Sequence, residues 1–237
     1  PAGQSFDCTP TAVYDGDGNL IRASQRIPGP TERVFNVDPE VAPRQDDLEH
    51  VRGHGLYIGH LLAHHYGHFI TEGLSAFWAA NHGDYDFIAA HPFLWDDSIP
   101  PFAQYALSKI GVDTSKIRII RRATRFERLT ISDRLWRINS SVNERYRPMV
   151  SKVAGRHSSN PKLKLYLSRA QIANRQIANE DEIERVFQAA GFTVINPQTY
   201  PLQCQMELYS QCSMLAGPAG SALHNVIFCP EGASVIS

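Results

Sequence analysis

Two regions of the chain alternate short apolar runs with stretches in which apolar residues recur at helical spacing. Apolar runs of this length predict strands, and the helical spacing predicts amphipathic helices. In the first region, residues 50–150, the predicted elements are strands at 55–59, 86–89, 117–120 and 125–131, and helices at 66–81 and from Pro100 or Pro101 to Ile110. This alternation is typical of an α/β layer.

The second region begins after a polar connection at residues 157–161. Its pattern predicts strands at 164–168, 192–195, 214–217 and 233–236, and helices at 180–190, 203–212 and from Ser221 onward. Asn179 and Glu182 form a capping-box-like start to the first of these helices. The order of the elements predicts a second parallel α/β layer. Two such layers with a cleft between them would hold a ligand at the carboxyl ends of their strands.

We therefore expect three parts in the chain: an N-terminal hairpin and irregular arm at 1–50, a lobe at 51–157 and a second lobe at 158–237. In the arm, residues 15–19 (Asp-Gly-Asp-Gly-Asn) predict a hairpin turn, because aspartate and glycine tolerate positive φ. The sequence stops at Ser237, in the middle of the last predicted strand, so we expect the second lobe to continue beyond it.

Composition and charge narrow the class of partner. Hydrophobic residues make up 43% of the chain and charged residues 20%, as in ordinary globular proteins, and the formal net charge is -1. Such a chain does not attract nucleic acid as a whole, so an anionic ligand must meet local positive charge. No apolar run approaches the ~20 residues that span a bilayer. None of the four cysteines has a Cys-x-x-Cys spacing, so we expect buried free thiols in a reducing compartment.

A glycine-rich turn at residues 217–221 (Gly-Pro-Ala-Gly-Ser) lies between a predicted buried strand and a predicted helix. Such turns hold phosphate in parallel α/β layers. Gly220 would allow the backbone to approach a ligand closely, and Ser221 would cap the helix, whose free N–H groups attract an anion such as a diphosphate. A tight strand–helix turn without a ligand is the alternative. The candidate binding residues here are Gly217, Gly220, Ser221, His224 and Asn225.

A local basic loop follows the first predicted strand of the second region. Ser168 and Arg169 end that strand, Arg175 follows, and residues 169–178 contain no acid. An arginine at a strand end points into the cleft of such a fold, where its fork of donors can neutralise phosphate. The alternative is a surface salt bridge to one of the next acids, Glu180, Asp181 or Glu184.

Histidines recur every four residues before the first predicted helix, at positions 60, 64 and 68, and Glu72 continues the spacing. On one continuous helix they would form a stripe typical of a metal site. Glycines interrupt the run and His60 adjoins a predicted strand, so we expect no metal site. His68 and Glu72 remain as a pair on one helix, and a histidine held by a carboxylate is a natural general base. A zinc hydrolase built on His60, His64 and His68 is kept as an alternative.

An Asp-x-Asp motif at residues 84–86 could hold a divalent ion that bridges a diphosphate. It lies before a predicted strand, at the amino end, whereas ligands of such layers bind at the carboxyl ends. We therefore interpret it as a solvated strand entry.

Motifs over residues 52–237 resemble glycosyltransferase family 61 in their order and in the gaps between them. That family includes bacterial capsular-polysaccharide proteins, plant xylan arabinosyl- and xylosyltransferases and animal O-linked N-acetylglucosamine transferases. The motifs are residues 66–72 (Tyr-Gly-His-Phe-Ile-Thr-Glu), 165–169 (Leu-Tyr-Leu-Ser-Arg), Arg175, 179–182 (Asn-Glu-Asp-Glu), 191–192 (Gly-Phe), 217–228 (Gly-Pro-Ala-Gly-Ser-Ala-Leu-His-Asn-Val-Ile-Phe) and 230–233 (Pro-Glu-Gly-Ala).

The resemblance implies an inverting transferase of the GT-B type, with two Rossmann-like lobes, an inter-lobe cleft, acceptor on the first lobe and sugar nucleotide on the second. The family's residues fall on positions already singled out. Its histidine and acid match His68 and Glu72, its two arginines match Arg169 and Arg175, and its Asn-Glu matches Asn179 and Glu180.

From the resemblance we expect a hexosyl- or pentosyltransferase that moves a sugar from a nucleotide-sugar donor, a UDP-sugar, to a glycan acceptor in capsular or surface polysaccharide biosynthesis. No cofactor or metal is expected, and no nucleic acid partner. The expected location is the cytoplasm, including peripheral association with the inner face of the membrane, and the oligomeric state is not predicted. The family commonly has histidine where this chain has Ala219, and threonine where this chain has His224. His224 could take over the role of the family's histidine. The alternative is a catalytically impaired binding protein on the same fold.

Overall fold

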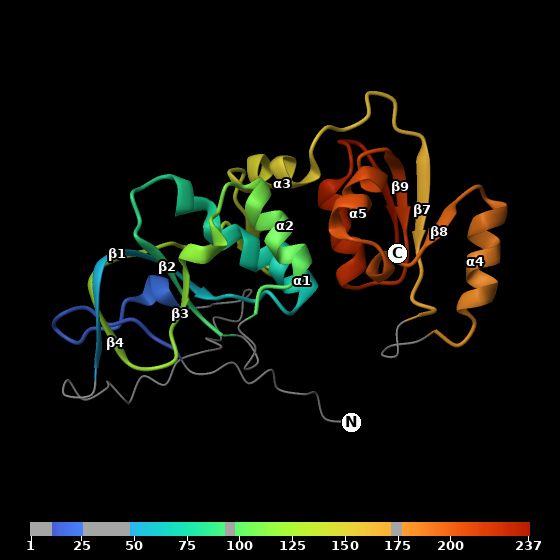
Figure 1. Ribbon diagram of the computed structural model, residues 1–237. Coiled ribbons are helices and arrows are strands. Elements are labelled where there is room, and N and C mark those ends of the chain that lie inside the picture. The colour runs from blue at the N-terminus through green and yellow to red at the C-terminus, as the bar shows by residue number, and fades with distance from the viewer. Residues whose placement is uncertain (1–10, 26–47, 93–97, 172–176) are drawn as a thin grey trace. The chain divides into compact units, whose positions relative to one another are not determined.

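The computed structural model describes residues 11–25, 48–92, 98–171 and 177–237, and the chain divides into two compact units, Pro1–Tyr146 (unit 1) and Arg147–Ser237 (unit 2) (Figure 1). Each unit carries a four-stranded sheet whose neighbouring strands are all parallel. Helices accompany both sheets, so the predicted α/β class is confirmed. The two-lobe arrangement around a cleft, and the lobe bounds at 51–157 and 158–237, stay predictions.

The sheet of unit 1 has the order β3-β2-β1-β4. Its strands are β1 (Glu49–His60), β2 (Phe87–His91), β3 (Ile117–Ile119) and β4 (Thr124–Ile131). All four were expected from apolar runs. Residues 55–60 of the central strand β1 are buried without alternation, as in a parallel strand that is covered on both faces. Around the sheet lie η1 (Arg22–Ser24), α2 (Pro101–Lys109), η5 (Thr114–Lys116), and a two-stranded antiparallel pair, β5 (Trp136–Arg137) and β6 (Ser141–Val142).

The predicted helix at 66–81 is helical over its whole length, but its helix type changes three times along it. It begins as α1 (Tyr66–His68), continues as the π-helical segment η3 (Phe69–Gly73), returns to α-helix at residues 74–75, and ends as the 3-10 helix η4 (Ala76–Asn81). All five residues of η3 are buried. Short π segments inside helices are frequent at functional sites, so this segment is of interest for the candidate site.

The predicted hairpin turn at 15–19 is confirmed. Tyr14 and Leu20 form an antiparallel bridge around it, and Asp15 Oδ1 accepts hydrogen bonds from the backbone N–H groups of Asp17 and Asn19. A hydrogen bond from the Asn19 side chain to Asp15 Oδ2, and then these backbone bonds, hold the pKa of the Asp15 carboxyl below its usual value. The predicted irregular arm falls mostly on residues 1–10 and 26–47, outside the described residues.

The sheet of unit 2 has the order β10-β9-β7-β8. Its strands are β7 (Leu163–Leu167), β8 (Thr193–Ile195), β9 (Cys212–Ala216) and β10 (Ser234–Ile236), and the helices are α3 (Tyr146–Ala154), which begins at the last residue of unit 1, α4 (Glu180–Ala189), η6 (Pro197–Thr199), α5 (Leu202–Tyr209) and η7 (Ser221–Phe228). Tyr166 of β7 stacks on Phe187 of α4 with ring centroids 4.4 Å apart, and Phe192 and Ala216 belong to the same core cluster.

Three expectations for unit 2 are wrong in detail. The helix predicted at 203–212 ends at Tyr209, because Cys212 pairs with Leu163 in the β9–β7 ladder. The segment from Ser221 is a 3-10 helix, and its N-cap is Gly220, so Ser221 is not the cap. The side chain of Asn179 makes no capping hydrogen bond; its backbone oxygen accepts from the N–H groups of Glu182 and Ile183 instead.

The cysteines are only partly as expected. Cys212 and Cys229 are buried, but Cys204 is exposed, so the prediction of a buried thiol is wrong there; Cys8 lies outside the described residues. A hydrogen bond with Cys212, together with burial, raises the pKa of the Cys229 thiol. In the part of the chain that the structure describes, no helix is both long and apolar enough to span a bilayer.

Candidate functional site

Several of the predicted site residues of unit 2 that the structure describes lie at the carboxyl edge of its sheet. Ser168 and Arg169 directly follow β7, and the glycine-rich turn at 217–220 directly follows β9, the neighbouring strand. Nη2 of Arg169 donates hydrogen bonds to the carbonyl oxygens of Ala219 at 2.6 Å and Pro218 at 3.4 Å. The strand-end arginine and the glycine-rich turn are predicted separately from the sequence. In the structure, hydrogen bonds connect them directly.

Gly220 makes this contact possible. A Cβ atom at this position would lie 2.2 Å from Nη2 of Arg169, and the backbone has φ +147. A side chain here would both strain the backbone and collide with the guanidinium. In this structure the group that closely approaches Gly220 is Arg169 of the same chain, and the close approach of a ligand stays a prediction.

Arg169 does not form the surface salt bridge that the alternative interpretation required. Among the described residues its side chain has no ion pair with the acids of α4, and its contact with α4 is made by its backbone N–H, which donates to Glu180 Oε1 at 3.1 Å. The same oxygen accepts from the hydroxyl of Tyr166 at 2.9 Å. Burial, and then this bond to Glu180, raise the pKa of Tyr166 above its usual value, so the phenol remains a donor.

Glu180 is a buried acceptor at this edge. It is 4% exposed, and its second oxygen, Oε2, is buried with no hydrogen-bond partner among the described residues. Ser168 Oγ donates to Glu184 Oε1 at 2.5 Å and accepts from the N–H of Ala170 at 3.0 Å. A buried carboxylate oxygen without a donor is unusual, so a ligand hydroxyl that reached it would supply the missing bond.

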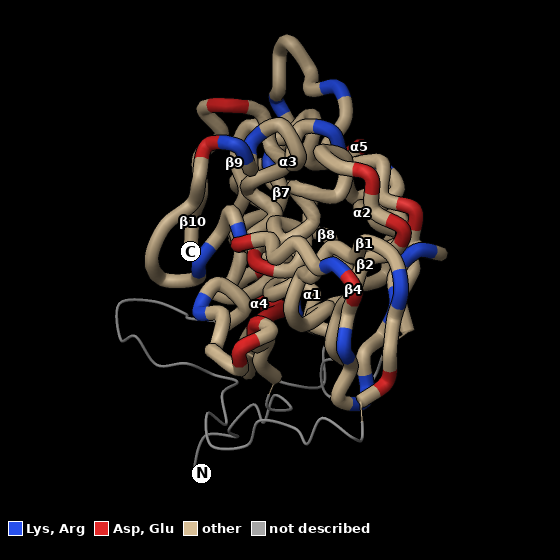
Figure 2. The backbone as a smooth tube through the Cα atoms, turned by 90° about the vertical axis from the view of Figure 1, so that its left-hand side faces the viewer, with Lys and Arg blue, Asp and Glu red and all other residues tan. Residues whose placement is uncertain are grey.

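The acidic start of α4 lies at the same end of the sheet. Its first turn carries Glu180, Asp181 and Glu182, and the red positions of α4 in Figure 2 mark this charge. Acids at a helix N-terminus are favourable electrostatically. Asn179 precedes them without a side-chain cap. Arg175, the other predicted phosphate ligand, lies outside the described residues.

Asn225 lies on η7, the helix that follows the glycine-rich turn, and bonds to α5. It is fully buried on η7, and its Nδ2 donates to the hydroxyl of Tyr209 at 3.0 Å. That hydroxyl donates to Gln205 Oε1 at 3.3 Å, and Gln205 Nε2 donates to the carbonyls of Pro197 and Tyr200. The amide of Asn225 therefore ties η7 to α5. His224 and Ser221 lie half-buried on η7.

In unit 1, the predicted pair of His68 and Glu72 is present. Nδ1 of His68 and Oε2 of Glu72 lie 2.9 Å apart; Glu72 is 2% exposed, whereas His68 is 22% exposed. The carboxylate fixes the proton on Nδ1 and leaves Nε2 as the basic nitrogen of the neutral ring. His65 accepts a hydrogen bond from the N–H of His68 through Nδ1 and so begins the helix. This geometry fits a general base.

Among the described residues, the other histidines are not placed to share a metal ion with this pair. His60 ends β1, with its ring 6.0 Å from that of His91 on β2, and His64 Nε2 lies 2.6 Å from the carbonyl oxygen of Ser98. Within the described ranges, no group of three His, Cys, Asp or Glu side chains is placed to hold a metal ion.

The Asp-x-Asp motif at residues 84–86 lies at the amino edge of β2. There Asp86 Oδ2 accepts a hydrogen bond from the N–H of His54 at 2.7 Å.

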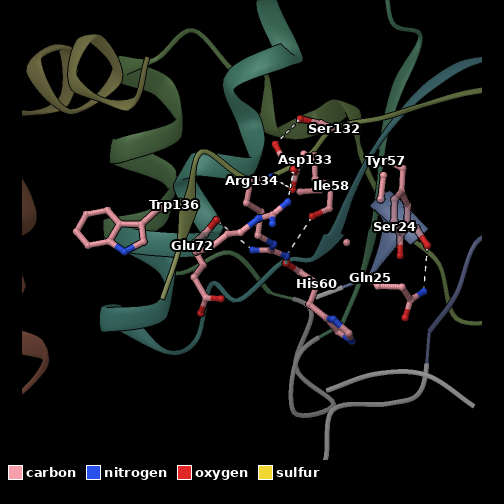
Figure 3. A pocket seen from close by; sticks show the side chains of 13 residues that line it. Ser24, Gln25, Tyr57, Ile58, His60, Glu72, Ser132, Asp133, Arg134 and Trp136 are labelled. Carbon is pink, nitrogen blue, oxygen red and sulfur yellow. Dashed lines mark hydrogen bonds and ion pairs between the residues drawn. The ribbon is translucent and has the colours of Figure 1, made fainter. Parts of the chain in front are cut away.

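Arg134, which follows β4, is not among the site residues predicted from the sequence. Its guanidinium donates to the main-chain oxygens of Glu72 at 3.0 Å and of Ile58 and His60 at 3.2 Å each (Figure 3). The signal that identified Arg169, an arginine just beyond a predicted strand, applies equally to Arg134. Residues at the end of β1 and Glu72 line a small pocket beside it.

Comparison with known proteins adds one match. The model of a protein family described as Glycosyltransferase 61 matches residues 66–236, a range that includes the His68–Glu72 pair, Arg134 and the carboxyl edge of β7 and β9. A search of curated proteins found no match to the chain.

Proposed function

Because the chain belongs to glycosyltransferase family 61, we propose that it transfers a sugar, with inversion of configuration, from a nucleotide-sugar donor to a hydroxyl of a glycan acceptor. The observation that carries this proposal is the pair of His68 and Glu72 inside the matched range. A carboxylate-held imidazole of this kind takes a proton from a hydroxyl as the new bond forms.

In the proposed reaction, His68 Nε2 removes the acceptor hydroxyl proton and the oxygen attacks the anomeric carbon. The bond from that carbon to the diphosphate breaks, and the diphosphate leaves with the bonding electrons. Positive charge must meet the leaving group. Arg169 is the described cation at the glycine turn, and Arg175, from the sequence, is the second. Glu180 Oε2 would accept a hydroxyl of the donor.

The finer parts of the proposal rest on the resemblance. They are a GT-B arrangement with the acceptor on unit 1 and the donor on unit 2, a UDP-sugar as donor, transfer without a metal, a hexose or pentose as the sugar, and a role in capsular or surface polysaccharide biosynthesis. A cytoplasmic location, or one at the inner face of the membrane, belongs to the same proposal.

Calorimetry against a panel of nucleoside diphosphates tests donor binding. UDP is expected to bind the wild-type protein, and Arg169→Ala to weaken that binding about tenfold or more, since a hydrogen bond to a charged group contributes about 1.5–3 kcal/mol. The matched control is Arg185→Ala, which removes an arginine whose Nε donates to the carbonyl of Asp181 within α4. If no nucleoside diphosphate binds the wild-type protein, the proposal fails.

Turnover with a donor panel tests the base. His68→Ala is expected to abolish transfer and to leave nucleotide binding unchanged, because His68 acts on the acceptor. Transfer that survives in His68→Ala would exclude the imidazole as the base.

A second candidate function is a catalytically impaired binding protein on the same fold. The observation that favours it is Ala219, an exposed methyl side chain where the family commonly has an imidazole. Nucleotide binding without turnover in the wild-type protein, and turnover in Ala219→His, would establish this candidate. Turnover in the wild-type protein would exclude it.

A further inference from the structure

Arg134 connects three parts of unit 1 that are distant in the sequence. It follows β4, which runs parallel to β1, so the carboxyl ends of both strands lie at one edge of the sheet. Its Nη2 reaches two oxygens at the end of β1, and its Nη1 reaches Glu72 in η3, 62 residues earlier in the chain. Figure 3 shows the guanidinium between the end of β1 and the main chain of Glu72.

The oxygens that Arg134 bonds lie where regular backbone bonding is interrupted. The β1–β2 register shifts between Tyr57 and His60, and Gly59 between them has φ +75. Glu72 lies in the π-helical segment. Buried carbonyl oxygens need donors, and the planar fork of arginine presents several in a fixed geometry that a lysine ammonium does not reproduce.

Gly59 makes room for this contact. A Cβ atom at position 59 would lie 3.1 Å from Nη2 of Arg134, closer than an ordinary van der Waals contact. A second connection acts on the same carbonyl: Ser75 Oγ donates to the oxygen of Glu72 at 2.8 Å and accepts from the N–H of Trp136 at 3.2 Å. The main chain of Glu72 is thus fixed from two sides by the segment that follows β4.

Glu72 is also the residue whose carboxylate holds His68 Nδ1. We propose that Arg134 is a positioning residue for the general base: by bonding the main-chain oxygens of Glu72, Ile58 and His60, it fixes the carboxylate that orients the His68 imidazole. This inference rests on the proposed function of His68. In this role Arg134 would act through the main chain of Glu72 and not by direct contact with the substrate.

The ¹⁵N chemical shifts of the His68 ring test the inference without any knowledge of the donor, because they report which ring nitrogen carries the proton. In the wild-type protein the proton is expected on Nδ1. Arg134→Lys keeps the charge and loses the fork, so the proton is expected to distribute over both nitrogens, as in Glu72→Gln. The control is Arg137→Lys: Arg137 lines the same pocket, and its side chain is half-exposed and pairs with Asp133 at 2.5 Å.

Rescue separates positioning from a general loss of structure. Arg134→Ala removes the side chain, and guanidinium ion added at low, non-denaturing concentration is expected to restore the Nδ1-protonated ring, whereas methylammonium is not. If Arg134→Lys fails to fold, this rescue decides the question. A wild-type ring pattern in folded Arg134→Lys, or in Arg134→Ala without guanidinium, would overturn the inference.

Kinetics supply the second readout. With an active donor, Arg134→Lys is expected to lower kcat about 10²-fold, because small displacements of a catalytic group have effects of that size, and to leave the KM for the donor unchanged. A raised KM with unchanged kcat would also overturn the inference. The two proposals fail differently: a disturbed His68 ring in a protein that transfers no sugar contradicts the proposed function and leaves the positioning role of Arg134 intact.

Discussion

Gly220 and Arg169 depend on each other. The guanidinium of Arg169 lies on the carbonyls of the turn, 50 residues away in the chain, because Gly220 has no side chain. The carbonyl oxygens of Pro218 and Ala219 accept hydrogen bonds from this guanidinium, which also places positive charge at the edge where a diphosphate is expected to bind. We therefore expect the two residues to act as one unit if a diphosphate binds at this edge.

Gly220→Ala is expected to separate this pair. The added Cβ would displace the guanidinium, and the residue would also be held at φ +147, which L side chains rarely adopt. We expect UDP binding to weaken about tenfold or more, as in Arg169→Ala, measured by calorimetry.

The matched control for this substitution is Gly191→Ala. Gly191 has φ +80, but a Cβ atom there would meet nothing within 4 Å. This variant is expected to lose about 1–2 kcal/mol of unfolding free energy from backbone strain and to keep the wild-type affinity for UDP. Equal affinities in the two variants would contradict a role of the contact between Gly220 and Arg169 in binding.

At the residue scale, local spacing in the sequence is enough to find candidates but not their partners. The pair of His68 and Glu72 was predictable because both lie on one helix, four residues apart. The contact of Arg169 with the turn and that of Arg134 with Glu72 join segments 50 and 62 residues apart, and no periodicity encodes such contacts. The burial of Asn225 also depends on tertiary packing, so it was predicted only as a site residue.

At the element scale, η7 is held in place by α5 through one hydroxyl. The side chains of Asn225, Tyr209 and Gln205 form a buried chain of hydrogen bonds. Gln205 extends it to the carbonyl of Pro197 in η6, which follows β8 at the carboxyl edge of the sheet. The glycine turn and the segment after β8 are therefore positioned by one polar network in the core of unit 2.

Tyr209→Phe tests this network. The substitution takes the hydroxyl away from the Asn225 amide and the Gln205 carbonyl oxygen, both buried, so unfolding free energy is expected to fall by about 1–3 kcal/mol. Urea denaturation followed by circular dichroism measures it. Tyr200→Phe, at an exposed tyrosine in the same unit, is expected to leave stability unchanged. A loss in both variants, or in neither, would contradict the network's role.

The sequence pattern predicts the bounds of most helices and strands, but it does not predict which helical segments are π or 3-10 helix. Apolar spacing fixes where the helix at 66–81 lies, but its π segment is accompanied by tertiary and side-chain bonds: Thr71 Oγ1 donates to the carbonyl of Gly67, and Arg134 to that of Glu72. Hydroxyls that bond to backbone carbonyls one turn back alter helix geometry. The end of α5 was misplaced because strand pairing recruits Cys212 into β9.

At the scale of the whole molecule, the two units share one structural feature. In each, an arginine just beyond a parallel strand bonds main-chain oxygens beside a glycine at the carboxyl edge of the sheet: Arg134 with Gly59 in unit 1, and Arg169 with Gly220 in unit 2. The sequence alternation predicted two α/β layers, and each unit has one. Both carboxyl edges are thus stabilised by a cation of the chain itself.

The units also differ in a way that allows unit 1 to be followed alone. All three tryptophans, Trp78, Trp95 and Trp136, lie in unit 1, so tryptophan fluorescence reports its unfolding and not that of unit 2.

Unit 1 also contains a histidine that folding keeps neutral. Burial lowers the pKa of His91 to about 4, although its Nδ1 bonds to the carbonyl of Ile120, and its ring neighbours are Tyr57 and His60.

The depressed pKa of His91 makes unit 1 sensitive to acid. The unfolded chain takes up a proton on this histidine below about pH 6.5, and the folded unit does so only near pH 4, so between these values acid favours unfolding. Stability is fully present above pH 6.5 and falls on the order of 3 kcal/mol by pH 4 through this group. His91→Asn, whose Nδ2 can replace Nδ1 as donor to Ile120, is expected to remove this part of the slope in urea titrations followed by tryptophan fluorescence at pH 7 and pH 5. His82→Asn, at an exposed position, should keep the wild-type slope, and an unchanged slope in His91→Asn would exclude His91 as its source.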